Sequence, residues 1–148
     1  FDEVGVQTTA FWNFRSFLSI GPSLYYNSAI GFTERFSLLA RLKSKGIMIS
    51  IIPTVFYSQR QKNLNGELFI QIQYSKKLKK PWSYVLNAQL LSSWDRFSVH
   101  GRSFQQIRTG VSFMNTQFGL ALYFDQYGPK PSSQMMFGLF VKQSFYGK

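Results

Sequence analysis

The stretch from Trp82 to Trp94, WSYVLNAQLLSSW, separates into two rows of opposite character. Alternate residues counted from Trp82 are mostly apolar and end in Trp94, whereas the row between them is mostly polar. This period of two predicts a β-strand with one apolar face. The two tryptophans are twelve positions apart, which is roughly 40 Å along a strand and about 30 Å of height at the usual tilt of barrel strands. We therefore predict a lipid-facing strand of a transmembrane β-barrel.

Composition supports a single domain over residues 1–148, because no linker or change in composition divides the chain. Aromatic residues make up 18% of the chain, yet the mean hydropathy is only -0.12. Apolar residues are therefore interleaved with polar ones, as in a sheet with one apolar face. The longest uncharged run, residues 16–33, contains Gly21, Pro22, Asn27 and Gly31, which argues against a membrane-spanning helix.

The same alternation predicts eight strands, at residues 12–26, 32–43, 47–58, 67–76, 82–94, 104–114, 118–125 and 134–146, after an N-terminal extension over residues 1–11. Pro22 cannot donate to a ladder and predicts a bulge or kink in the first strand. An even number of strands is usual for bacterial single-chain barrels and would leave both termini on one side. The predicted fold is an all-β, eight-stranded, antiparallel up-and-down transmembrane β-barrel with a closed lumen over residues 12–146.

Aromatic side chains of the predicted outward rows fall at the two ends of the strands, as expected for the two interfaces of a bilayer. The predicted lipid-interface aromatics are Trp12, Tyr74, Trp82, Tyr84, Phe118 and Phe145 at a periplasmic rim, and Tyr26, Phe32, Tyr57, Trp94 and Phe124 at an external rim.

These strands resemble the small eight-stranded outer-membrane barrels of the OmpA/OmpX type, over about residues 11–146 and at the level of architecture. The last strand, FGLFVKQSF, resembles the C-terminal strand that the outer-membrane assembly machinery recognises, with Phe145 as its terminal aromatic. The resemblance implies the outer membrane of a Gram-negative bacterium, a signal peptide already removed, and contact with outer-membrane lipid and lipopolysaccharide.

Strand parity places seven charged residues in the lumen: Arg15, Arg35, Arg41, Glu67, Arg108, Asp125 and Lys142. Side chains just fill an eight-stranded barrel, so we expect ion pairs in a closed interior. The four charges of the external half, on strands two, four, six and seven, can balance one another. Arg15, Arg41 and Lys142 lack a carboxylate at their level. We hypothesise that Asp2 and Glu3 fold back to neutralise them; lipid phosphate, water or a partner's acid is the alternative.

A lysine-rich turn carries Lys76, Lys77, Lys79 and Lys80. The net charge of +11 indicates anionic surroundings. The turn is expected either to anchor the rim near anionic lipid or to dock an acidic periplasmic partner.

No catalytic, cofactor or metal site is predicted. The chain lacks cysteine and contains one histidine, His100, with Asp95, Ser98 and Ser103 nearby in sequence. Catalytic triads are recognised by geometry, and residues this close in sequence rarely converge. Small-barrel lipid A deacylases and palmitoyltransferases use a histidine with a serine, but no equivalent spacing is found here.

Three functions remain open. We favour a non-enzymatic outer-membrane barrel, most readily a structural or accessory subunit, with protein partners, of a larger secretion, assembly or uptake complex. The alternatives are a lipid-modifying outer-membrane enzyme and a soluble lipocalin-like or nucleic-acid-binding barrel. Soluble nucleic-acid binders gather their aromatics in one groove, whereas here aromatics occupy both ends of the outward rows, so no nucleic acid is expected.

Overall fold

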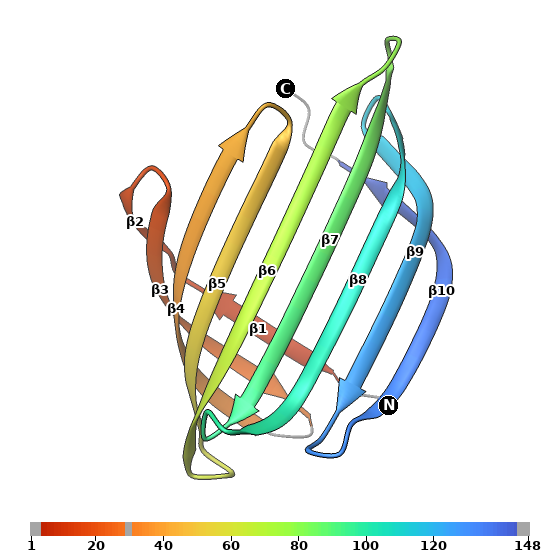
Figure 1. Ribbon diagram of the computed structural model, residues 1–148. Helices are drawn as coiled ribbons and strands as arrows, with labels where there is room; N and C mark the ends of the chain where they lie inside the picture. The colour runs from red at the N-terminus through yellow and green to blue at the C-terminus, as the bar shows by residue number, and fades with distance from the viewer. Residues whose placement is uncertain (1–3, 29–30, 145–148) are drawn as a thin grey trace.

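The computed structural model describes residues 4–28 and 31–144 as one all-β, antiparallel up-and-down sheet (Figure 1). Its strands are β1 (Gly5–Thr9), β2 (Trp12–Arg15), β3 (Leu18–Asn27), β4 (Gly31–Ser44), β5 (Ile47–Ser58), β6 (Asn63–Lys77), β7 (Trp82–Asp95), β8 (Val99–Phe113), β9 (Thr116–Tyr127) and β10 (Ser132–Gln143). Within residues 4–28 and 31–144, no helix is long and apolar enough to cross a membrane.

The connections between strands define two ends of the sheet. The turn end carries the connections at residues 16–17, 45–46, 78–81 and 114–115, and the loop end carries those at residues 28–30, 59–62, 96–98 and 128–131. Strands β6 and β8 begin at Asn63 and Val99, four and five residues before the predicted starts at 67 and 104. The connections at the loop end are correspondingly shorter than the sequence predicts.

The prediction of one continuous strand over residues 12–26 is wrong, because a hairpin turn at residues 16–17 divides this segment into β2 and β3. Residues 5–9, expected to precede the barrel, also belong to the sheet as β1. Both β1 and β2 pair with β3, through Thr9 with Ser23 and Trp12 with Ile20. These two pairs keep one register, and the break between β1 and β2 lies opposite Pro22, which has no N–H to donate.

The ten strands occupy nine positions, since β1 and β2 share one, and the prediction of eight strands is therefore wrong. The sheet order begins at β1 and ends at β10, with no pairing between the two among the described residues. The described strands therefore do not form the predicted closed barrel by themselves.

An odd number of positions also places the two ends of the described chain at opposite ends of the sheet (Figure 1). Val4 lies at the loop end, where its carbonyl accepts a hydrogen bond from Ser28 N at 3.0 Å. Ser144 lies at the turn end, where its N–H donates to Asn115 O at 2.9 Å. The expectation that both termini lie on one side is wrong for this sheet.

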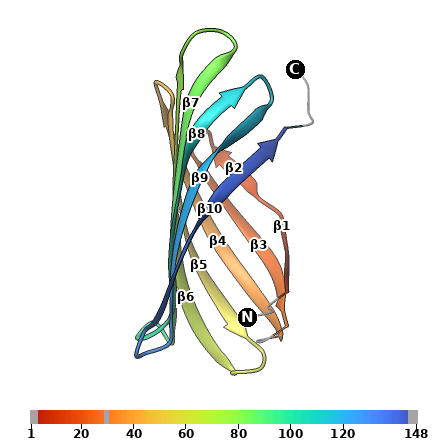
Figure 2. The ribbon, with the colours of Figure 1, turned by 90° about the vertical axis from the view of Figure 1, so that its right-hand side faces the viewer.

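The two faces of the sheet have inverted polarity. The sheet is strongly curved, so that β1 and β3 stand opposite β7–β9 (Figure 2). Among the described residues of the inner face, ten polar or charged ones are buried, compared with two large apolar ones, Leu39 and Phe56. On the outer face, large apolar side chains such as Phe36, Ile107 and Leu120 are exposed. Soluble domains show the reverse distribution.

Candidate functional site

An ion pair between Arg35 of β4 and Glu67 of β6 connects these two strands on the inner face near the loop end. Arg35 donates two hydrogen bonds to the carboxylate, at 3.1 and 3.3 Å. The side chains are 10% and 13% exposed. The guanidinium also lies over the rings of Tyr25 and Phe56, 4.7 Å from each centroid. This geometry fixes a buried cation by charge and by ring contact together.

A second ion pair joins Asp125 of β9 to Arg102 of β8. Arg102 Nη2 and Nε donate to the carboxylate at 2.7 and 3.1 Å. Tyr123 donates its hydroxyl to the same carboxylate at 2.8 Å. The Arg102 guanidinium lies 4.7 Å from the Tyr127 ring centroid. Asp125 is 4% exposed, so this acid is buried with its charge fully paired.

Arg102 is not among the predicted lumen charges, because it precedes the predicted strand at residues 104–114. The available signal was the alternation of Arg102, Phe104, Gln106 and Arg108, which continues the inner row of β8 toward the loop end. Arg108 lies six residues further along the strand than Arg102, roughly 20 Å away. Asp125 therefore pairs with Arg102, and the expectation that Arg108 would help to balance the loop-end acids is wrong.

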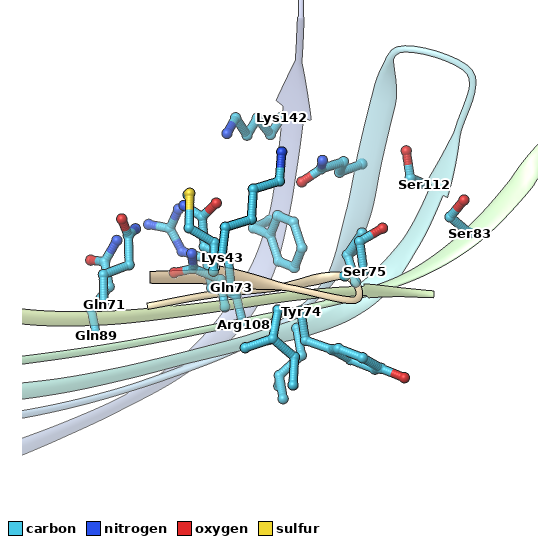
Figure 3. Close-up of a pocket in the computed structure, with 18 residues that line it drawn as sticks. Lys43, Gln71, Gln73, Tyr74, Ser75, Ser83, Gln89, Arg108, Ser112 and Lys142 are labelled. Carbon is cyan, nitrogen blue, oxygen red and sulfur yellow. The ribbon is translucent and has the colours of Figure 1, made fainter. Parts of the chain in front are cut away.

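A cavity of about 490 Å³ opens on the inner face in the turn-end half of the sheet. Three cationic side chains line it, Lys43, Arg108 and Lys142, and none of its lining residues is acidic. Its walls also include three serines and five side-chain amides, Gln71, Gln73, Asn87, Gln89 and Gln117. Figure 3 shows Lys43, Gln71 and Gln89 on the same side of the sheet as Lys142, with Tyr74 projecting to the other side.

Strand register explains how these residues meet. A single lateral row runs Lys43, Met48, Gln73, Asn87 and Arg108 through the pairings of β4 to β8. All five positions face inward because directly paired residues of an antiparallel sheet share a face. The sequence places these residues far apart, and only the register brings them into one row.

Phe140 of β10 adds an aromatic ring to the cavity, whose apolar lining also includes Met48 and Val85. It pairs with Gly119, which pairs with Gly110. A side chain on Gly110 would collide with the backbone of Phe118 and Gly119, so the two glycines allow a close approach of β8 and β9 beside the ring. Arg108 Cζ lies 6.0 Å from the Phe140 ring centroid.

The predicted cluster of Arg15, Arg41 and Lys142 required β10 to lie against the first strands, and the described sheet has no such pairing. Lys142 instead lines the cavity with Lys43 and Arg108. Arg15 and Arg41 are exposed in the turn-end half. Asp2 and Glu3, expected to neutralise the cluster, lie outside the described residues. Val4, the first described residue, is at the loop end, away from all these cations.

The described carboxylates are confined to one half of the sheet. The four carboxylates that the structure describes, Glu34, Glu67, Asp95 and Asp125, all lie in the half nearer the loop end. The turn end carries the rim lysines, by which we mean Lys76, Lys77, Lys79 and Lys80, and all four are exposed. Lys43 and Lys142 approach the same end from the inner face. The turn end is therefore strongly positive.

The predicted interface aromatics lie near the two ends of the sheet. At the turn end, Trp82 contacts Phe113 and Phe118, with centroids 4.8 and 6.2 Å apart. Further aromatics there are Trp12 on β2, Tyr74 and Tyr84. At the loop end, Tyr26 and Phe32 have centroids 4.9 Å apart, and Tyr57, Trp94 and Phe124 lie in the same half. Phe145 lies outside the described residues.

The hydrogen-bond partners of His100 are the Ser103 side chain and the Gly128 backbone, and neither is a carboxylate. Its Nε2 lies 2.8 Å from Ser103 Oγ, and its Nδ1 lies 2.7 Å from the carbonyl oxygen of Gly128. The histidine therefore ties β8 to the connection between β9 and β10. Across residues 4–28 and 31–144, no group of three metal-binding side chains is found.

Comparisons of this chain with protein-family models, curated proteins and solved structures found no match.

Proposed function

We propose that this chain is a membrane-embedded β-sheet protein of the bacterial outer membrane, a non-enzymatic structural or accessory subunit of a larger outer-membrane complex. The observation that carries the proposal is the inverted polarity of the sheet. Exposed apolar side chains cover the outer face, and polar residues and two ion pairs fill the inner face. A lipid environment favours this distribution, whereas water opposes so large an apolar surface.

The positions of the aromatic residues support the same environment. Aromatic side chains near the turn end and near the loop end match the enrichment of Trp and Tyr at the two interfaces of a bilayer. The rim lysines at the turn end would meet anionic head groups or an acidic partner.

The free edges of the sheet support the role of a subunit. On β10, the outward Leu139 is 82% exposed, against 46% for Leu120 on β9, because β10 has a neighbour on one side only. Unpaired strand edges are not tolerated within the hydrocarbon region of a membrane. An edge left open in this sheet therefore requires a further strand in the complete assembly.

Strand direction specifies that further strand. Both β1 and β10 run from the loop end to the turn end, so joining them directly would make a parallel pair. A fully antiparallel barrel needs an additional strand between them that runs from the turn end to the loop end. We propose that the barrel is completed by such a strand from outside the described sheet.

Membrane location is tested with the native protein in isolated cell envelopes. We expect the protein to stay in the pellet through alkaline and urea washes and to need detergent for extraction. After reconstitution, brominated acyl chains should quench tryptophan fluorescence most strongly when bromine lies near the head groups. Release without detergent would overturn the proposal.

Completion by another strand is tested with cysteine variants, since the chain has no natural cysteine. A photo-crosslinker attached at Leu139→Cys should form an adduct with a strand outside the sheet. The same probe at Leu120→Cys, on a strand paired along both edges, should not. Crosslinking within one chain between Leu139→Cys and cysteines placed along β1 would show direct parallel closure and contradict the proposed further strand.

A lipid-modifying enzyme is the second candidate, favoured by the contact between His100 and Ser103. A serine hydroxyl within hydrogen-bond distance of an imidazole is the basic arrangement for nucleophilic catalysis. If this contact is catalytic, a fluorophosphonate probe will label the purified protein and Ser103→Ala will abolish the labelling. We expect no labelling, because the other imidazole nitrogen meets a backbone carbonyl instead of a carboxylate.

A further inference from the structure

We propose that the cavity at the turn end binds a small organic phosphate that also carries hydroxyl groups, such as a sugar phosphate or a glycerol phosphate head group. This binding site goes beyond the structural role proposed above. It depends on the residues of the inner face and would stand whether the protein acts alone or in a complex.

The positive charge of the cavity lining favours an anionic ligand. Lys43, Arg108 and Lys142 line one cavity that has no acidic residue. The ion pairs of the described sheet involve Arg35 and Arg102, not these three cations. Cations gathered on an inner face repel one another unless an anion lies between them. A phosphate group offers several charged oxygens to such a set, and Arg and Lys are its usual protein partners.

Size restricts the ligand to a small molecule. The cavity volume of about 490 Å³ falls within the range of typical small-molecule sites, roughly 300–1,000 Å³. An acidic peptide would instead meet the exposed rim lysines first. The cavity therefore favours a compact anion over a macromolecular partner.

A side-chain oxygen without a hydrogen-bond donor favours a ligand that carries hydroxyl groups. Asn87 Oδ1 is buried and has no hydrogen-bond partner among the described residues. Buried acceptors normally have a donor. A phosphate dianion only accepts, so a donor must come from another part of the ligand, and a hydroxyl group can supply it. Asn87 pairs across the sheet with both Gln73 and Arg108, which places this acceptor between an amide and a cation.

Phe140 favours a sugar ring for the same ligand. Its side chain supplies an apolar surface in the cavity, and the C–H face of a sugar ring can pack against such a surface. The opposite edges of a sugar carry hydroxyls that suit the amide-lined walls. Cations, amides and one aromatic ring together match the three kinds of group in a sugar phosphate.

The test is calorimetric titration of the full chain in a neutral amine-oxide detergent. The probes are glucose 6-phosphate, inorganic phosphate and glucose. We expect glucose 6-phosphate to bind more tightly than either of the others, because it alone offers charge and hydroxyls together. The double variant Lys43→Gln/Lys142→Gln should weaken its binding by at least about tenfold. Both lysines are exposed, so this variant is expected to fold, which circular dichroism will verify.

The matched control is Lys79→Gln/Lys80→Gln, which removes the same charge from the same end of the sheet outside the cavity. We expect its affinity for glucose 6-phosphate to stay within about twofold of the parent. Asn87→Leu should reduce the preference for glucose 6-phosphate over inorganic phosphate. This second variant keeps all cations in place and isolates the hydroxyl contact.

Bicelles with or without phosphatidylglycerol then distinguish the sources of the ligand. Competition by phosphatidylglycerol against glucose 6-phosphate would support a lipid head group, and its absence would support a soluble sugar phosphate. The proposal is overturned if glucose 6-phosphate does not bind at millimolar concentration, if inorganic phosphate binds equally well, or if the control variant weakens binding as much as the cavity variant.

Discussion

The buried ion pair between Arg35 and Glu67 leads to a quantitative prediction for Glu67→Gln. The substitution keeps the shape of the side chain but removes the charge that faces a guanidinium whose side chain is 10% exposed. Breaking a buried pair costs about 3–5 kcal/mol. The introduced amide would still accept one hydrogen bond, and the rings of Tyr25 and Phe56 would still contact the cation. We therefore expect a loss near the lower limit, about 3 kcal/mol, or roughly a hundredfold in the unfolding constant.

The measurement is urea unfolding in detergent micelles, followed by tryptophan fluorescence, with the electrophoretic heat shift as a check on folding. The double variant Arg35→Met/Glu67→Leu is the control, because it removes both charges and leaves neither unpaired. It should lose about 1.5 kcal/mol or less, since replacing a buried pair by apolar groups is often close to neutral. If Glu67→Gln stays within about 0.5 kcal/mol of the parent, the two charges are not buried as described.

Three further predictions concern other parts of the sheet. Ile107→Lys, at the middle of the outer face of β8, should cost about 2–4 kcal/mol in a bilayer, and Phe113→Lys at the turn end about 1 kcal/mol or less; equal costs measured by unfolding from vesicles would contradict a lipid-facing surface. Gly119→Ala should destabilise the sheet by about 2 kcal/mol or more, because its Cβ would collide with the carbonyl oxygen of Thr109, whereas Gly138→Ala meets nothing within 4 Å and should unfold at the urea concentration of the parent. Replacing the four rim lysines by glutamine should weaken binding to phosphatidylglycerol vesicles by up to about 1 kcal/mol per lysine, and unchanged binding at low salt would show that these lysines do not meet anionic lipid.

Alternation predicted most of the sheet because one face is apolar and the other is polar. The bounds of β5, residues 47–58, are those the sequence predicts, and β7 differs from its prediction by one residue. The hairpin between β2 and β3 was missed for a geometric reason. Trp12 pairs with Ile20, and a bulge shifts the register between Asn13 and Arg15, just before the turn. Because of this bulge, Trp12 and Ile20 share the outer face although a two-residue turn lies between them, so the alternation in the sequence does not reveal the turn. The turn, Ser16–Phe17, also lacks the Gly, Asn or Pro that would mark it.

The candidate site was only partly predictable. Inward residues such as Arg108 and Lys142 follow from parity within single strands, whereas Lys43, at the end of the predicted strand 32–43, is not among the predicted lumen charges. Their grouping depends on register and on how far the sheet closes, neither of which parity determines. The prediction of a cluster with Arg15 and Arg41 requires a closed sheet, and the described β10 does not pair with the strands that carry those residues.

The order of strands also bears on how the protein folds. From β4 onward each strand pairs only with its sequence neighbours, so the sheet can form by adding one hairpin to the next without closing a long loop. By this route every strand edge becomes paired except the outer edges of β1 and β10. The gap between β1 and β10 is therefore closed last, and the rate of assembly in a cell would be set by the binding of the strand that closes it.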